Sequence, residues 1–111
     1  MTATQSETQA AAVRLPPSQV QLIRAAVVDI FGADAGVWLF GSRADLDQRG
    51  GDIDLYVETS CNAATALHHA GRLYARLQRE LGEQRIDIVT RSPGEPEQAI
   101  HRVARESGVR L

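Results

Sequence analysis

The residues best suited to chemistry are two aspartates, Asp52 and Asp54, which stand two positions apart in the segment 52–57. In a strand, residues i and i+2 share a face, and a rise of about 3.3 Å per residue leaves their Cα atoms about 6.6 Å apart. Aspartate is depleted in strands, and two like charges on one face repel each other. A hard divalent cation with oxygen ligands relieves that repulsion. The pair therefore indicates a metal site, although a lone Asp-x-Asp more often marks a polar strand face.

A third aspartate, Asp87, lies in an apolar run between Ile86 and Ile88. A strand that faces a core does not tolerate an unpaired charge at such a position. Three aspartates on central strands favour a metal site over a polar strand face. The predicted chemistry is phosphoryl transfer, because metal ions held by carboxylates stabilise both the attacking and the leaving oxygen of an in-line displacement.

A phosphate-binding turn is predicted at Gly41 and Ser42, directly after the apolar segment 37–40. Glycine lets the backbone approach a ligand closely, and a serine hydroxyl with nearby N–H groups can hold terminal phosphates. Arg43 could clamp phosphates in a bidentate manner. Two plainer roles stay open, a helix-capping hydroxyl for Ser42 and a solvated surface charge for Arg43. We predict that Gly41, Ser42 and Arg43 bind phosphate groups, such as those of a nucleotide.

These motifs resemble the signature of the DNA polymerase beta-like nucleotidyltransferase superfamily, and they are most similar to its smallest members, the minimal nucleotidyltransferases. The resemblance is carried by the segments 40–44 and 50–55, by Asp87 at the place of the family's third acidic residue, and by an ending at 100–109 that is similar to the family's last helix. It covers about residues 19–111.

The chain departs from the family's commonest pattern in the loop between Ser42 and Asp52. Asp45 and Asp47 stand near the place of a frequent glycine, and Gly51 stands where a serine often precedes the first aspartate. Two extra acids near a triphosphate are unfavourable, so the loop must point them outward or the affinity for nucleotide is modest.

The resemblance implies a fold and a reaction. The fold is of the α/β (α+β) class, a small mixed central sheet flanked by helices. Asp52 and Asp54 would ligate one or two Mg²⁺ ions bound to ATP. Asp87 would complete the second metal position and orient or deprotonate the incoming hydroxyl. The implied reaction moves a nucleoside monophosphate, AMP from ATP, to a hydroxyl group.

The partner follows from size and from the same resemblance. One domain of 111 residues leaves no separate domain to enclose a small acceptor, so a protein acceptor is favoured. Minimal nucleotidyltransferases are often antitoxins of helical HEPN toxins, which they modify or block by binding. We therefore expect a HEPN-type toxin as partner. The alternative is a non-catalytic antitoxin that neutralises its partner by occlusion.

Apolar periodicity and stop signals predict six elements. Val20, Ile23, Val27 and Ile30 recur at helical spacing behind a Ser18 N-cap, and Asn62 and Gly82 mark the two ends of a longer helix. The predicted helices are 18–30, 62–81 and 97–108, and the predicted strands are 37–40, 53–58 and 85–90. The pattern does not decide whether the first two strands are parallel. Residues 1–17 are expected to form a flexible N-terminal tail and 18–111 the minimal nucleotidyltransferase domain.

Side-chain placement follows from these elements. Alternation puts Asp52, Asp54, Tyr56 and Glu58 on a polar strand face and Ile53, Leu55 and Val57 on the opposite face. The apolar stripe of the long helix comprises Ala66, Leu67, Ala70, Leu73, Tyr74, Leu77 and Leu81. The three histidines (His68, His69 and His101) are predicted at the surface, and Trp38 in the core.

Bulk composition excludes several function classes. The net charge of −2 gives no pull toward nucleic acid, so no direct nucleic-acid binding is expected. No apolar run approaches the ~20 residues that span a bilayer, so no membrane association is expected. The only cysteine, Cys61, cannot form an internal disulfide, which suits a cytoplasmic protein. All twelve basic residues are arginines, so any cationic chemistry must come from arginine.

Overall fold

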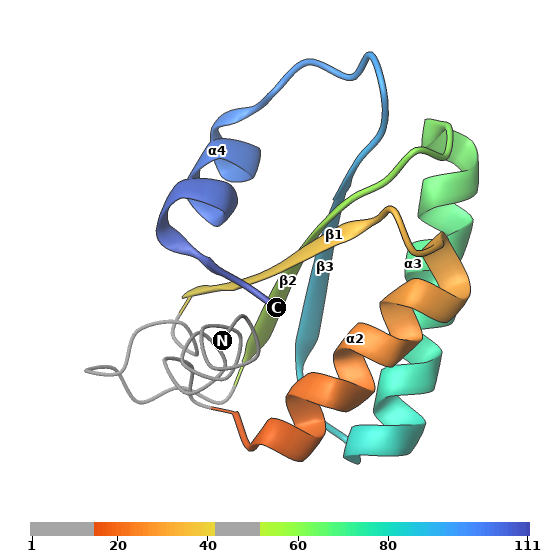
Figure 1. The fold of residues 1–111 in the computed structure, drawn as a ribbon, viewed down its shortest axis with the longest axis vertical. Coiled ribbons are helices and arrows are strands. Elements are labelled where there is room, and N and C mark those ends of the chain that lie inside the picture. Colours follow the sequence, from red (N-terminus) through yellow and green to blue (C-terminus); the bar gives the residue numbers. More distant parts are fainter. Residues whose placement is uncertain (1–14, 42–51) are drawn as a thin grey trace, which may run out of the picture.

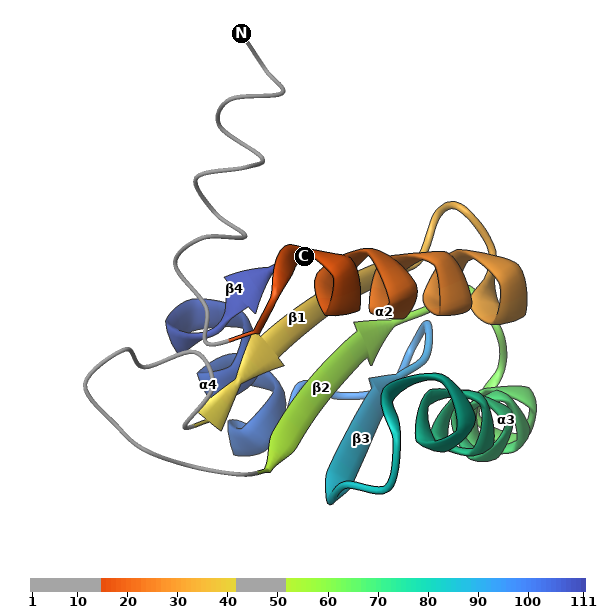
Figure 2. The ribbon, with the colours of Figure 1, turned by 90° about the horizontal axis from the view of Figure 1, so that it is seen from below.

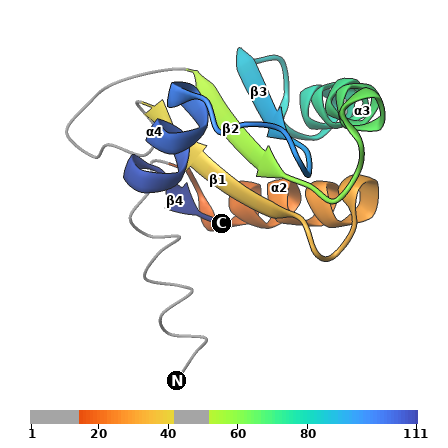
Figure 3. The same ribbon diagram turned by 90° about the horizontal axis from the view of Figure 1, so that it is seen from above.

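The computed structural model describes residues 15–41 and 52–111, which fold into one mixed sheet covered by helices on both faces (Figure 1). Figures 2 and 3 show two helices side by side on one face and a single helix on the other. The predicted α/β class with a small mixed sheet is confirmed. The elements in chain order are α2 (Pro17–Phe31), β1 (Gly36–Phe40), β2 (Ile53–Glu58), α3 (Ala63–Leu81), β3 (Ile86–Arg91), α4 (Ala99–Ser107) and β4 (Val109–Arg110).

The strand order in the sheet is β3-β2-β1-β4. β1 pairs with β2 and with β4 in antiparallel fashion, whereas β2 and β3 are parallel. The direction of the first two strands, which the sequence left open, is therefore antiparallel. The short strand β4 was not predicted, because two residues carry no periodicity of their own.

Helix α2 begins earlier than predicted. Pro16 is its N-cap residue and Pro17 its first residue, so the expected N-cap role of Ser18 is wrong. A proline at the first helical position has its φ already set for a helix, and it has no N–H that needs a cap. Leu15 is buried in the core, whereas Pro16 and Pro17 are exposed at the start of α2. The rest of the predicted tail, residues 1–14, lies outside the described residues.

Helix α3 begins and ends where the sequence indicated. The Asn62 side chain accepts a hydrogen bond from the Thr65 N–H at 2.8 Å, and Gly82 ends the helix with a φ of 85°. The N-cap bond satisfies one of the helix's free N–H groups, and glycine adopts a positive φ without strain. Both local predictions are confirmed.

The predicted apolar stripe of α3 is partly wrong. Ala66, Leu73 and Leu77 are buried against the sheet, but Leu67 is 75% exposed and Tyr74 is 47% exposed. Each residue advances about 100° around the helix axis. The seven predicted residues together occupy a wider arc of the helix than one sheet face can cover. Leu67 and Tyr74 stand at the uncovered margin of that arc.

The sheet separates two apolar clusters. The larger one lies between the sheet and helices α2 and α3, and it includes Ile53, Leu55 and Val57 as predicted. The smaller one lies between the sheet and α4, and it consists of Trp38, Phe40, Tyr56 and Ala104, with Val89 packed against it. The predicted core position of Trp38 is therefore confirmed, since it lies 9% exposed in this second cluster.

Helix α4 changes the character of the sheet face that carries the aspartates. Tyr56, predicted on a polar face, is fully buried beneath α4. His101 was predicted at the surface and is 2% exposed, so that prediction is wrong. Its ring stacks on Tyr56 at a centroid distance of 5.6 Å, and its Nδ1 accepts a hydrogen bond from the Gln98 N–H at 3.0 Å. The helix packs its apolar side on the sheet, and His101 lies on that side.

The start of α4 also differs from the prediction. The helix begins at Ala99 with Gln98 as N-cap, two residues after the predicted Glu97. Its C-terminal glycine, Gly108, turns the chain into β4, and a Cβ there would lie 2.2 Å from the Ala104 carbonyl oxygen. Only glycine fits so close to the preceding turn.

The other two histidines behave differently from each other. His68 is exposed as predicted, whereas His69 is half-buried and its ring packs edge-on against Phe31 at 5.5 Å. None of the helices in residues 15–41 and 52–111 is long and apolar enough to cross a membrane.

Candidate active site

Asp54 and Asp87 stand side by side in the sheet. Asp54 is the second residue of β2, and the parallel register places it directly opposite Asp87 of β3. On its other side Asp54 is opposite Phe40, the last residue of β1. Residues 33 positions apart in the sequence are thus neighbours, at the end of the sheet where β1 ends and β2 and β3 begin.

The surroundings of Asp54 disfavour its negative charge. Its pKa is raised above the ordinary value of 3.8, first because burial removes water from the carboxylate. The negative charge of Asp87 is the next cause, followed by that of Asp52, and the positive charge of Arg85 opposes them. Two carboxylates held together in this way attract a cation or share a proton.

Gly41 places the backbone against this pair. Its φ is +74°, and a Cβ on this residue would lie 2.2 Å from the Oδ2 atom of Asp54. No other residue type fits there without moving the carboxylate. Gly41 therefore lies against Asp54, and its contact with a phosphate stays a prediction. Ser42 and Arg43, the other predicted nucleotide-binding residues, lie outside the described residues.

Asp52 is near the pair but is directed elsewhere. It precedes β2, its side chain is 48% exposed, and its Oδ2 lies 3.8 Å from the Nε of Arg85. The structure thus brings two of the three predicted metal ligands together and places the third within electrostatic reach of Asp54. Within residues 15–41 and 52–111, no three His, Cys, Asp or Glu side chains are close enough to hold a metal ion together.

The donor set still suits magnesium. Mg²⁺ prefers hard oxygen ligands, keeps several waters, and is commonly bound through one or two carboxylates together with substrate phosphates. Asp54 and Asp87 provide two carboxylates whose mutual repulsion a cation would relieve. Gly41 has no side chain, so its backbone lies directly against the Asp54 carboxylate.

The sequence did not reveal a polar network between β2 and α4. The Tyr56 hydroxyl donates to Oε2 of Glu58 at 2.7 Å, and burial together with Glu58 raises the pKa of Tyr56 to about 12. Arg105 pairs with Glu97 and lies 3.9 Å from Glu58. A phenol with so high a pKa is a poor general base at neutral pH. The network connects α4 to the sheet. The alternation along β2, which places Tyr56 and Glu58 on one face, was the only sign of it in the sequence.

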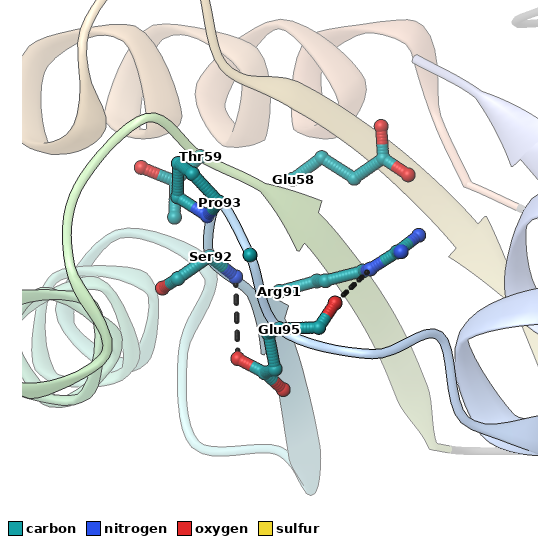
Figure 4. A pocket seen from close by; sticks show the side chains of 7 residues that line it. Glu58, Thr59, Arg91, Ser92, Pro93 and Glu95 are labelled. Atoms are coloured by element: carbon teal, nitrogen blue, oxygen red, sulfur yellow. Dashed lines mark hydrogen bonds between the residues drawn. The ribbon is translucent and has the colours of Figure 1, made fainter.

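A pocket of about 230 Å³ opens at the opposite end of the sheet, where the parallel strands β2 and β3 end (Figure 4). Polar groups of its lining form hydrogen bonds with one another. The Arg91 Nε donates to the Glu95 carbonyl oxygen at 3.2 Å, and the Ser92 N–H donates to the Glu95 carboxylate at 3.3 Å. Glu58 also lines it. Two glutamates and one engaged arginine do not form a phosphate cradle.

A second pocket of about 230 Å³ lies between α2 and α3. Its lining residues are Asp29, Ile30, Arg72, Ala75, Arg76 and Arg79. This is the arginine row that the sequence places on one side of the long helix. Its excess of positive charge makes it a candidate for contact with an anionic group.

A scan against models of known protein families finds no match for this chain, and a search of curated proteins finds none either. The family assignment accordingly stays a prediction from the residues quoted above.

Proposed function

We propose that this protein is a metal-dependent nucleotidyltransferase that moves AMP from ATP to a hydroxyl group of a partner protein. The observation that carries the proposal is the Asp54–Asp87 carboxylate pair beside the backbone of Gly41. Asp54 is half-buried and Asp87 is exposed. Two like charges held side by side on one sheet face repel each other unless a cation lies between them, and their position next to Gly41 suits a metal-bound triphosphate.

The reaction would proceed in one displacement. The acceptor oxygen forms a bond to the α-phosphorus of ATP, and the bond from that phosphorus to the bridging oxygen breaks, so pyrophosphate leaves with the electron pair. The acceptor proton passes to the Asp87 carboxylate, which acts as general base. Asp52, Asp54 and Asp87 would hold Mg²⁺, which would supply charge neutralisation at the phosphates.

Asp52 has one contact in the free protein and a different proposed contact in the nucleotide-bound protein. In the free protein its carboxylate faces Arg85 at 3.8 Å. The side chains of Asp52 and Arg85 are 48% and 75% exposed, and such an exposed pair contributes little stability, so it costs little to break. Asp52 is therefore free to join Asp54 when nucleotide and metal bind. Gly41, Ser42 and Arg43 would contact the phosphates.

The acceptor is proposed to be a protein because a domain of this size has few residues left to enclose a small acceptor. The carboxylate pair lies at the end of the sheet where β1 ends and β2 and β3 begin, and phosphoryl transfer requires the attacking oxygen to be held in line and shielded from water. A docked protein would supply that missing wall. The resemblance to minimal nucleotidyltransferases suggests a HEPN-type toxin, met in the cytoplasm, where ATP and Mg²⁺ are available.

A second function, neutralisation by binding alone, is favoured by one observation. Asp52 is directed to Arg85, so only two of the three carboxylates are together in the described part of the chain. A protein that merely occludes its partner needs no third ligand. The two functions differ in whether the partner gains mass.

The test is to incubate the co-purified partner with ATP and Mg²⁺ and to weigh it. We expect a gain of one AMP per modified hydroxyl with the unaltered protein and a loss of at least about 100-fold in rate with Asp54→Asn. Glu83→Gln, which removes an exposed carboxylate outside the site, is the matched control and should retain full activity. Full transfer by Asp54→Asn would refute the site, and a partner that is inhibited without gaining mass would favour occlusion.

A further inference from the structure

Three arginines form a positively charged row along one side of α3. Arg72, Arg76 and Arg79 are spaced at i, i+4 and i+7, so they lie on one side of the helix and span about 10 Å of its axis. All three line the pocket between α2 and α3. Like charges one helical turn apart repel one another, which destabilises the helix unless a counter-charge is present.

The middle arginine is already neutralised. Arg76 donates to Oδ2 of Asp29 at 2.9 Å across the two helices and to Oε1 of Glu80 at 3.0 Å along its own helix. These bonds raise the pKa of Arg76, with Asp29 as the first cause. Its side chain is 24% exposed and forms a fixed centre for the pocket.

The outer two arginines are not neutralised. Arg72 and Arg79 are exposed, and among residues 15–41 and 52–111 neither makes an ion pair. The three arginines of the row and the two acids bound to Arg76, Asp29 and Glu80, leave an excess of one positive charge. The whole chain has a net charge of −2, so this row is a local exception.

We propose that the pocket between α2 and α3 binds an acidic segment of a partner protein, whose carboxylates pair with Arg72 and Arg79. Arg72 and Arg79 are seven residues, about two helical turns, apart, which matches carboxylates at i and i+7 on one side of a helix. Ile30 and Ala75 supply an apolar floor between the two charges.

Charge and shape favour a protein segment over a nucleic acid. Phosphates at regular short intervals would approach Asp29 and Glu80, which lie at the centre of the row. The lining has no aromatic side chain on which a base could stack. An acidic helix can instead place its carboxylates at the two outer arginines only. The inference rests on the proposed function for the existence of a partner, but it requires no chemistry.

The first test uses two alanine-based helical peptides of identical composition. One has glutamates at i and i+7 on one side, and the other has the same two glutamates on opposite sides of the helix. We expect the one-sided peptide to bind about fivefold more tightly, the change that about 1 kcal/mol from two exposed ion pairs produces. Amide chemical shifts of Ile30 and Ala75 should move on binding. Equal affinities would mean unspecific attraction and would overturn the proposal.

The second test uses charge reversal. Arg72→Glu combined with Arg79→Glu should abolish binding of the one-sided peptide. Arg24→Glu, an exposed arginine of α2 outside the pocket lining, is the control and should bind normally. Retained binding in the double variant, or tighter binding of a single-stranded oligonucleotide than of the peptide, would overturn the proposal. Asp54→Asn should bind the peptide normally, so a failure of docking and a failure of the transfer chemistry are separate results.

Discussion

At the scale of single residues, the candidate site is a balance of charge and space around Asp54. Burial and two neighbouring aspartates disfavour its charge, and Arg85 only partly offsets them. Gly41 tolerates the closeness of the carboxylate because it has no Cβ. These features cost stability in the free protein. A binding site for a cation-bound ligand has such features, because binding of the cation removes the repulsion between the carboxylates.

Asp54→Asn should therefore stabilise the free protein at neutral pH. The folded-state pKa of Asp54 is raised above its unfolded value of 3.8, so the folded state binds the proton more readily. The stability cost is fully present above the folded-state pKa and disappears as the pH falls through the window down to 3.8. We expect a rise of a few degrees in Tm at pH 7 that shrinks in that window.

Thermal unfolding of both proteins between pH 7 and pH 4 measures this difference. Glu83→Gln, which neutralises an exposed carboxylate away from the pair, controls for the change in net charge and should shift Tm little. A lower Tm for Asp54→Asn at pH 7 would show that the carboxylate is stabilised in the free protein.

At the scale of elements, local signals set the two ends of α3, whereas strand pairing sets which residues meet in the candidate site. The bond from the Thr65 N–H to Asn62 starts α3, and Gly82 ends it. The helix then leads into β3, whose parallel pairing with β2 carries Asp87 to Asp54. An error in that register by one residue would turn Asp87 to the opposite face of the sheet.

Asn62→Ala should lower the free energy of unfolding by about 1 kcal/mol, because the Thr65 N–H loses its partner at the start of α3. Urea unfolding followed by circular dichroism measures the change as a lower midpoint with an unchanged slope. Asn62→Asp retains an acceptor oxygen at the N-cap and should unfold near the original midpoint. An unchanged midpoint in Asn62→Ala would mean that the cap bond contributes nothing measurable.

At the scale of the whole molecule, two regions of the described surface differ in charge. The end of the sheet with Asp54, Asp87 and Gly41 has an excess of negative charge, whereas the groove between α2 and α3 has an excess of positive charge. Helix α4 covers β1 and β2 on one face, where Trp38 and Tyr56 are buried. Residues 15–41 and 52–111 thus place an acidic region at one end of the sheet and a basic region between α2 and α3.

Mg²⁺ and ATP together should raise Tm, and neither alone should do so well. The aspartates at the acidic end of the sheet repel a bare triphosphate, so the metal must bridge the two sets of negative charge. A ligand that binds only the folded state stabilises it according to its concentration. We expect a shift of several degrees at millimolar Mg²⁺ and ATP. An equal shift with ATP in EDTA would place nucleotide binding away from the aspartates.

The sequence by itself determined the features that depend on neighbouring residues. Asn62 and Gly82 define α3 because capping bonds and positive φ angles are local properties. Alternation along 53–58 correctly separated Asp54 from the apolar side of β2, because successive side chains of a strand point to opposite faces. The mixed α/β class followed from the order of such elements.

Only the tertiary structure decided which distant residues meet. The direction of β1 against β2 and the parallel register of β2 and β3 bring Asp54 between Phe40 and Asp87, and no local pattern encodes that pairing. Burial of His101 against Tyr56 depends likewise on where α4 packs. Long-range pairing is set by the free energy of burying whole faces together, to which residues far apart in the chain contribute jointly.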